Sequence, residues 1–231
     1  DFQDYKKYRK KIQNIKRELQ KGNVYQINYT NDKRYKSNID PLKLYLYLRN
    51  QAHPKYGYYI NYDYMHILSF SPELFFKRED NKITSSPMKG TRPRSEDYKE
   101  DEQLKLELKN SIKDKAEHLM IVDLLRNDIG KIAIPGSVMV KDIFKIESHK
   151  TVHQMISHIS GKLDRSINEV GIISALFPGG SVTGAPKESA MKIIDNLENY
   201  SRDIYTGSIG YIKSNGDLNF NIAIRTMTMN N

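Results

Sequence analysis

Paired strand-like runs joined by tight turns constrain the fold of this chain more than any other feature. The last pair reads YTGSIGYIK and LNFNIAIRTM, with Ser214–Asn215–Gly216–Asp217 between its two runs. Asn-Gly between two strands strongly indicates a β-hairpin, because both residues accept the positive φ that a two-residue turn requires. Residues 56–70 and 74–86 show the same pattern, with turns expected near residues 61–63 and 79–82.

Helical patterns separate these hairpins. We expect helices over residues 3–21, 41–51, 97–128, 151–158, 167–176 and 186–197, and further strand-like runs at 24–30 and 132–147. Because the strands cluster into hairpins and do not alternate singly with helices, they predict an α+β fold with antiparallel sheets. No repeat, low-complexity linker or domain boundary is visible along the chain.

Composition narrows the functional classes. Hydrophobic residues make up 38% and charged residues 28% of the 231 residues, as in a folded globular protein. The absence of Cys excludes a disulfide, a Cys-based metal site and a Cys nucleophile. With no signal-peptide pattern and no apolar run of membrane-spanning length, we expect a cytoplasmic protein without a membrane partner. The chain begins with Asp1 and not Met, so we interpret it as a fragment.

The net charge of +9 is compatible with nucleic acid, an anionic surface or a small anionic substrate. The main basic cluster covers residues 6–17, KKYRKKIQNIKR. Apolar residues recur there at helical spacing, with Lys and Arg between them, so we interpret the cluster as the solvated face of a helix.

Two acidic residues, Asp114 and Glu117, lie three positions apart in an expected helix and therefore share one face. Two carboxylates on one face suit a hard divalent cation. The alternative is an exposed acidic pair whose charges balance those of the neighbouring Lys113 and Lys115.

Three further features have both a chemical and a plain interpretation. The loop FPGGSVTGAPK resembles a phosphate cradle but lacks the P-loop lysine, so it could be a simple Gly-rich turn. Lys89, before Gly90 and Thr91, is either an anion anchor or nucleophile or a surface lysine at a turn. Glu73, among apolar residues, is either a general acid with a raised pKa or a hairpin-edge residue.

Taken together, the runs GNVYQIN, SFSPELFF, SSPMKGTRPR, AEHLMIVDLLRNDIGKIA, FPGGSVTGAPKESAMKIID, YTGSIGYI and FNIAIRT resemble the chorismate-utilising enzymes. This family includes component I of anthranilate synthase and of aminodeoxychorismate synthase. The resemblance covers essentially the whole chain. It implies antiparallel β-sheets packed face to face with helices outside, and a chorismate-binding catalytic domain over residues 1–231 that lacks its C-terminal part and the usual N-terminal region.

The resemblance also implies roles for individual residues. Glu73 matches the general acid that protonates the departing 4-hydroxyl of chorismate, while Glu117 matches a Mg²⁺ ligand and Asp114 an acid near it. Positions that match the binding site of the ring carboxylate are Gly90, Thr91 and Ser181. Tyr205 and Arg225 match the pair that binds the enolpyruvyl carboxylate.

Two positions discriminate within the family. Gln26 stands where isochorismate and salicylate synthases have a lysine base that activates water, so the resemblance implies that ammonia is the nucleophile. Lys89 stands where anthranilate synthases usually have Ala, and is typical of aminodeoxychorismate synthases. The implied reaction yields 4-amino-4-deoxychorismate for para-aminobenzoate and folate synthesis, with ammonia from a glutamine amidotransferase subunit.

Alternatives remain at this level. Anthranilate synthase component I is the close one, and a basic nucleic-acid-binding module, suggested only by net charge, is the distant one. The family generally has a His where this chain has Gln154, with His153 just before it, so the role of His153 is open.

Overall fold

The computed structural model describes residues 5–230, and the chain forms two compact units. The first unit contains the described residues up to Pro72, then Pro178–Gly207, and those from Ala223 onward. The second contains Glu73–Phe177 and Ser208–Ile222. Each unit is therefore built from stretches that are distant in sequence. Residues 3 and 4 of the first expected helix lie outside the described part.

The first unit has three helices and two small antiparallel sheets among its described residues. The elements are α1 (Tyr5–Gln20), β1 (Gln26–Ile27), α2 (Pro41–Ala52), β2 (Tyr56–Tyr62), β3 (Met65–Ser71), β9 (Gly184–Ala185), α6 (Lys187–Leu197) and β12 (Thr226–Asn230). One sheet has the order β12-β3-β2, and the other pairs β1 with β9. The strand expected over 24–30 is thus confirmed only in its middle.

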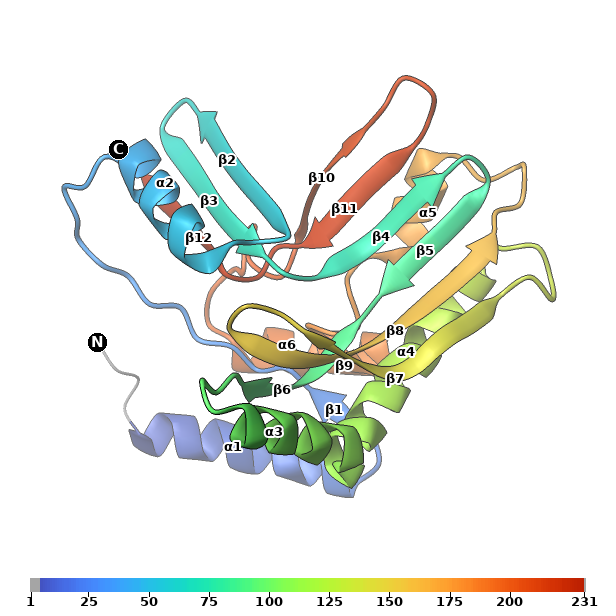
Figure 1. The fold of residues 1–231 in the computed structure, drawn as a ribbon, viewed down its shortest axis with the longest axis horizontal. Helices are drawn as coiled ribbons and strands as arrows, with labels where there is room; N and C mark the ends of the chain where they lie inside the picture. Colours follow the sequence, from blue (N-terminus) through green and yellow to red (C-terminus); the bar gives the residue numbers. More distant parts are fainter. Residues whose placement is uncertain (1–4, 231) are drawn as a thin grey trace. The chain divides into compact units, whose positions relative to one another are not determined.

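Helix α2 packs on the three-stranded sheet (Figure 1). Asp40 caps its first turn by accepting a 2.8 Å hydrogen bond from the backbone N of Lys43, and Pro41 suits the first helical position. From this helix the ring of Tyr45 stacks on Phe70, with 5.3 Å between ring centroids, and Leu68 is fully buried beside them. Burial of these apolar groups joins helix and sheet.

The second unit is a seven-stranded antiparallel sheet with helices. Its strand order is β10-β11-β4-β5-β8-β6, and β7 pairs with β8. The elements are β4 (Leu74–Glu79), β5 (Lys82–Ser86), β6 (Met88–Pro93), α3 (Tyr98–Asn110), α4 (Ile112–Gly130), β7 (Met139–Ser148), β8 (Val152–Lys162), α5 (Glu169–Leu176), β10 (Ser208–Ile212) and β11 (Leu218–Ile222). The expected α+β fold with antiparallel sheets is confirmed, as is the Asn-Gly hairpin.

The helix expected over 151–158 is wrong, because this stretch belongs to strand β8. Residues 153–156 pair with both β6 and β7, so these two strands lie along opposite edges of β8. β8 is buried along most of its length and therefore lacks the polar–apolar alternation that marks a strand in a sequence. Met155, Ile156 and Ile159 are all at most 3% exposed.

The single helix expected over 97–128 is also wrong, because the chain breaks at Ser111. Ser111 has extended backbone angles, φ −64° and ψ 109°, and its hydroxyl accepts a 3.2 Å hydrogen bond from the backbone N of Asp114. This N-cap starts a second helix with a new phase. The two helices therefore do not share one apolar face, since Leu108 is fully buried and Ile112 is 85% exposed.

One stability prediction follows from the burial of β8. Ile159→Ala should lower the free energy of unfolding by about 2–5 kcal/mol, because it removes buried methyl groups and leaves a cavity. The matched control is Ile212→Ala on β10, where the side chain is 50% exposed and the loss should stay below about 1 kcal/mol. Urea unfolding of both variants measures the difference, and equal losses would contradict the assignment of β8 as the core strand.

Candidate active site

Glu73 lies at the junction between β3 and β4 and is only 6% exposed. Its backbone oxygen accepts a 3.1 Å hydrogen bond from the backbone N of Ile222, which fixes this junction against the end of β11. Glu73 is therefore a buried acidic residue on a hydrogen-bonded backbone. It directly precedes the β4–β5 hairpin and is buried there.

Lys89 lies on β6, opposite the fully buried Met155 of β8, and is partly buried. It is not at a turn, and β6 was not expected from the sequence. Burial lowers the pKa of Lys89, while the negative charges of Glu73 and Glu117 act in the opposite direction. The three residues are thus close enough to influence one another electrostatically, and the amine loses its proton more easily than an exposed lysine does.

Gly90 allows β6 to approach the helices closely. Its φ is +76°, and a Cβ at this position would lie 2.8 Å from Cδ1 of Leu108 and 3.1 Å from Cβ of Asp114. Any other residue would be strained, would collide with the side chain of Leu108 and would crowd Asp114 at the start of α4. Thr91, next in the strand, is exposed and pairs in register with Gln154.

Asp114 has a different partner from the one the sequence suggested. Nη2 of Arg92 donates a 3.1 Å hydrogen bond to its Oδ2, and the side chain of Asp114 is 17% exposed. Its ion pair is therefore with Arg92 of β6 and not with Lys113 or Lys115 beside it in sequence. Asp114 therefore joins α4 to β6, on the strand that carries Lys89.

Glu117 is more available to a ligand. Its side chain is 42% exposed and lies 3.9 Å from Nζ of Lys113, a weak surface ion pair. Among residues 5–230, no three acidic or histidine side chains gather into a metal-binding group. Mg²⁺ nevertheless often binds through one or two carboxylates together with waters and substrate oxygens, so Glu117 and Asp114 fit part of such a site.

His118 was missed by the sequence reasoning. It is fully buried in α4, and its Nε2 lies 2.8 Å from Oγ of Ser157 on β8. Burial, and then the nearby charge of Lys89, lower the pKa of His118 to about 4, so the ring is neutral at pH 7. The signal was a histidine directly after Glu117 that begins an apolar run, a context that favours burial.

The side chain of His153 makes contacts with two other protein groups. Its side chain is 1% exposed, its Nε2 lies 3.0 Å from Oδ1 of Asp101, and its Nδ1 lies 2.8 Å from Oγ of Ser148. Asp101 also accepts two 2.8 Å hydrogen bonds from Arg94, one from Nε and one from Nη2. His153 therefore joins β8 to α3, and Gln154, with its opposite orientation on the strand, is the neighbour of Thr91.

Gln26 and Ser181 belong to the first unit and lie on segments that run side by side. Gln26 pairs with Ala185 across the β1–β9 ladder. Gly184 makes this approach possible, because a Cβ there would lie 2.2 Å from the backbone oxygen of Gln26. Ser181 is 8% exposed in the loop just before β9, and Oε1 of Gln26 is buried with no hydrogen-bond partner in the described part of the chain.

Tyr205 and Arg225 also belong to the first unit. Their segments meet through two backbone hydrogen bonds, from Thr206 N to Ala223 O and from Ala223 N to Gly207 O, both 2.9 Å. Tyr205 is 38% exposed and Arg225 is exposed. Both side chains are therefore available to a ligand.

The predicted site residues thus form two groups, one in each unit. The second unit brings together Glu73, Lys89, Gly90, Thr91, Asp114 and Glu117. The first unit contains Gln26, Ser181, Tyr205 and Arg225. The first group supplies the acid, the amine and the carboxylates, and the second supplies amide, hydroxyl and guanidinium groups.

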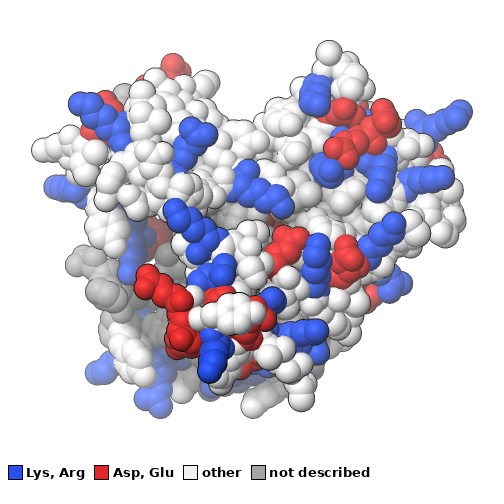
Figure 2. Space-filling view, in the orientation of Figure 1, with Lys and Arg blue, Asp and Glu red and all other residues white. Residues whose placement is uncertain are grey.

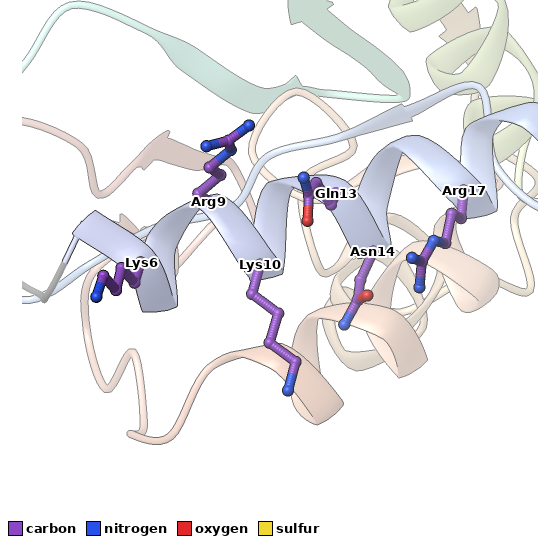
Figure 3. A pocket seen from close by; sticks show the side chains of 6 residues that line it. All are labelled: Lys6, Arg9, Lys10, Gln13, Asn14 and Arg17. Atoms are coloured by element: carbon purple, nitrogen blue, oxygen red, sulfur yellow. The ribbon is translucent and has the colours of Figure 1, made fainter.

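A separate basic hollow runs along α1 (Figure 3). It is lined by Lys6, Arg9, Lys10, Gln13, Asn14 and Arg17, all from this helix, and none of them is a predicted site residue. On the face in Figure 2, Lys and Arg are spread out with Asp and Glu among them. The solvated-face interpretation of residues 6–17 fits this arrangement. Within residues 5–230, no helix has the length and apolar character needed to cross a membrane.

Comparison with known proteins agrees with this geometry. A family model described as chorismate binding enzyme matches residues 1–231. The chain is 43% identical over 212 residues to anthranilate synthase component 1 of Saccharolobus solfataricus, covering 92% of this chain and 50% of that protein. It is 45% identical over 220 residues to the chloroplastic aminodeoxychorismate synthase of Arabidopsis thaliana, covering 94% of this chain and 24% of that protein.

A solved structure shows the same fold. Anthranilate synthase component I from Streptococcus pneumoniae TIGR4 superposes with a TM-score of 0.86 at 29% identity, covering 100% of this chain and 51% of that chain. The present chain thus spans half or less of the length of these relatives. The matched model, the identities and the shared fold agree, and the chain belongs to the family of chorismate-binding enzymes.

Proposed function

We propose that this chain is a catalytic part of an aminodeoxychorismate synthase, which converts chorismate and ammonia to 4-amino-4-deoxychorismate. The observation that carries the proposal is Lys89, a partly buried amine with a lowered pKa that is electrostatically coupled to the buried Glu73. A neutral amine beside a carboxylic acid is the pair needed to add a nucleophile while a hydroxyl leaves.

In the proposed reaction, Glu73 donates a proton to the 4-hydroxyl of chorismate while the neutral amine of Lys89 adds at ring carbon 2. The C4–O bond breaks and water leaves. Ammonia then attacks carbon 4, the bond from carbon 2 to Lys89 breaks, and the ring double bonds return to their first arrangement. The amine of Lys89 is regenerated and the product keeps its enolpyruvyl group.

Positioning of the two substrate carboxylates supports this scheme. Glu117 and Asp114 would hold Mg²⁺, which supplies charge neutralisation for the ring carboxylate when bound. In the proposal, the same ring carboxylate accepts hydrogen bonds from backbone and hydroxyl donors of Gly90, Thr91 and Ser181. Tyr205 and Arg225 are assigned to the enolpyruvyl carboxylate, where a guanidinium can bind two oxygens at once.

Gln26 bears on the choice of nucleophile. Its side-chain amide cannot remove a proton from water, so this position offers no base for hydration of chorismate. Ammonia needs no such base, because it is itself a nucleophile. The proposed source of ammonia is a glutamine amidotransferase subunit, and the absence of Cys from this chain agrees with a separate polypeptide for glutamine hydrolysis.

Anthranilate synthase component I is the second candidate. It is favoured by the Saccharolobus relative at 43% identity and by the shared fold with the Streptococcus protein. The two functions differ in the product. Anthranilate synthesis ends with loss of pyruvate, whereas the proposed reaction does not, and the amine of Lys89 has no assigned role in anthranilate formation.

The product test uses the full gene product with chorismate, ammonia and Mg²⁺. Mass spectrometry should find 4-amino-4-deoxychorismate without release of pyruvate, and removal of Mg²⁺ with a chelator should abolish turnover. Direct appearance of anthranilate together with pyruvate would instead establish the second candidate.

Removal of the amine should stop the reaction. Lys89→Ala is expected to lower kcat by about 1,000-fold or more, since the covalent step is lost, while the Kd for chorismate changes less than about threefold. Lys82→Ala, an exposed lysine on the neighbouring strand β5, is the matched control and should keep normal turnover. Normal turnover in Lys89→Ala would remove this residue from the mechanism.

The pKa of Lys89 gives a pH prediction. Because the pKa is lowered, the amine becomes neutral at a lower pH than an exposed lysine, so its reaction with an amine-modifying reagent should begin at lower pH. The charge of Glu73 raises this pKa, so Glu73→Gln should shift the labelling curve further towards low pH. Peptide mass spectrometry reads both curves, with labelling of Lys82 as internal reference. A shift towards high pH would show that Glu73 and Lys89 are not coupled as described.

A further inference from the structure

A buried ion pair in the first unit lies outside the residues assigned above. Glu198 directly follows the end of α6, and Arg202 lies four residues later. Nε and Nη2 of Arg202 donate 2.7 Å hydrogen bonds to the two carboxylate oxygens of Glu198. The side chains are 14% and 3% exposed for Arg202 and Glu198 respectively. This ion pair is bidentate and largely shielded from water, and bidentate pairs between charged groups are among the stronger hydrogen-bonded interactions in proteins.

The guanidinium also donates to two backbone carbonyls. Nη2 of Arg202 lies 2.7 Å from the oxygen of Asn28, and Nη1 lies 3.0 Å from the oxygen of Val182. The last backbone hydrogen bond between these two segments runs from Asn28 N to Thr183 O at 2.8 Å. Arg202 therefore bridges the segments at the point where the short β1–β9 ladder ends.

The carboxylate extends the same bridge on its other side. Oε1 of Glu198 accepts hydrogen bonds from the backbone N of Thr30 at 2.8 Å and from its hydroxyl at 3.1 Å. Nη1 of Arg202 reaches the hydroxyl of Thr206 at 3.4 Å, one residue after Tyr205. The ion pair is thus connected to three stretches of chain: residues 28–30, the loop before β9, and the segment around Tyr205.

Each of these stretches contains a candidate site residue or lies within two residues of one. Gln26 lies two residues before Asn28, Ser181 directly precedes Val182, and Tyr205 directly precedes Thr206. A two-residue strand pair cannot fix such a loop by itself, because a short ladder has few hydrogen bonds. The side-chain bridge supplies the missing constraint.

We propose that Glu198 and Arg202 are positioning residues that hold the Ser181 loop and the Tyr205 segment in the arrangement that binds the carboxylates of chorismate. The pair touches neither the substrate nor the reacting atoms. This inference rests on the proposed assignment of Ser181 and Tyr205 to chorismate, and it extends that assignment to the residues that orient them.

Arg202→Lys is the direct test, because Lys keeps the charge but cannot bind a carboxylate and two carbonyls in a fixed fork. In the full gene product, the KM for chorismate should rise about 10- to 100-fold, since misplacement of binding groups by about 1 Å has effects of this size. At saturating chorismate, kcat should change less than about threefold. A pair with only a structural role would lower the thermal midpoint and leave KM unchanged in the folded fraction.

Arg78→Lys is the matched control. Arg78 also pairs with a carboxylate, Glu169, at 3.0 Å and also donates to a backbone carbonyl, that of Asp80, at 2.8 Å. Arg78 lies in the second unit and is not one of the assigned site residues. This variant should show an unchanged KM. An equal rise in KM in both variants would overturn the proposal.

Thr30→Ala keeps the test decisive if Arg202→Lys does not fold. It removes the hydrogen bonds of the Thr30 hydroxyl to Glu198 and Tyr200 and leaves the ion pair in place, so KM should rise about threefold. An unchanged KM in Thr30→Ala, or in folded Arg202→Lys, would refute the positioning role. The proposed function is judged separately by the product of the wild-type protein, because the ratio of KM values does not depend on which product forms.

Discussion

The pairing of β8 with three other strands is the constraint on which the second unit depends. One edge of β8 is hydrogen-bonded to β6 along residues 152–156 and to β5 along residues 159–162. The other edge is hydrogen-bonded to β7. Lys89 and Thr91 are in register with Met155 and Gln154 of this strand. A one-residue slip of β6 would turn both side chains to the opposite face, so the register of β8 determines where the amine points.

Two buried histidines add polar links that an apolar core could not provide. His118 joins α4 to Ser157 of β8, and His153 joins Asp101 of α3 to the same strand. Hydrogen bonds of this kind are directional, and a buried polar group without its partner is costly, so they select one placement of the helices. Glu117 adjoins His118 in sequence, and its position relative to Lys89 therefore depends on the same link. The two histidines therefore link α3 and α4 to the strand that is in register with Lys89.

Local sequence patterns predicted most of the fold. The hairpins and the helices α2, α5 and α6 followed from turn residues and helical spacing, which act over a few residues. β8 was mistaken for a helix because its burial along most of its length depends on strands and helices distant in sequence. The break at Ser111 was missed because helical spacing continues through it, and only the backbone angles separate α3 from α4.

The site shows the same division between local and distant information. Sequence motifs identified Glu73, Lys89 and Glu117 as residues whose side chains could take part in the chemistry. The structure brings these three close enough to influence one another electrostatically. The sequence could not show that Asp114 pairs with Arg92, or that Arg202 bridges Asn28 and Val182, because these partners lie 22, 174 and 20 residues apart. Contacts over such separations are created by the fold itself, and a single sequence holds no local sign of them.

Four of the candidate site residues lie close to the points where the chain passes from one unit to the other. The chain passes between the units four times, after Pro72, Phe177, Gly207 and Ile222. Glu73, Ser181, Tyr205 and Arg225 each lie within four residues of one of these passages. At the last passage, Ile222 donates to the backbone of Glu73 in the second unit, and the next residue, Ala223, donates to Gly207 in the first. Consecutive peptide groups therefore hold the residue before this passage and the residue after it, each by a hydrogen bond within its own unit.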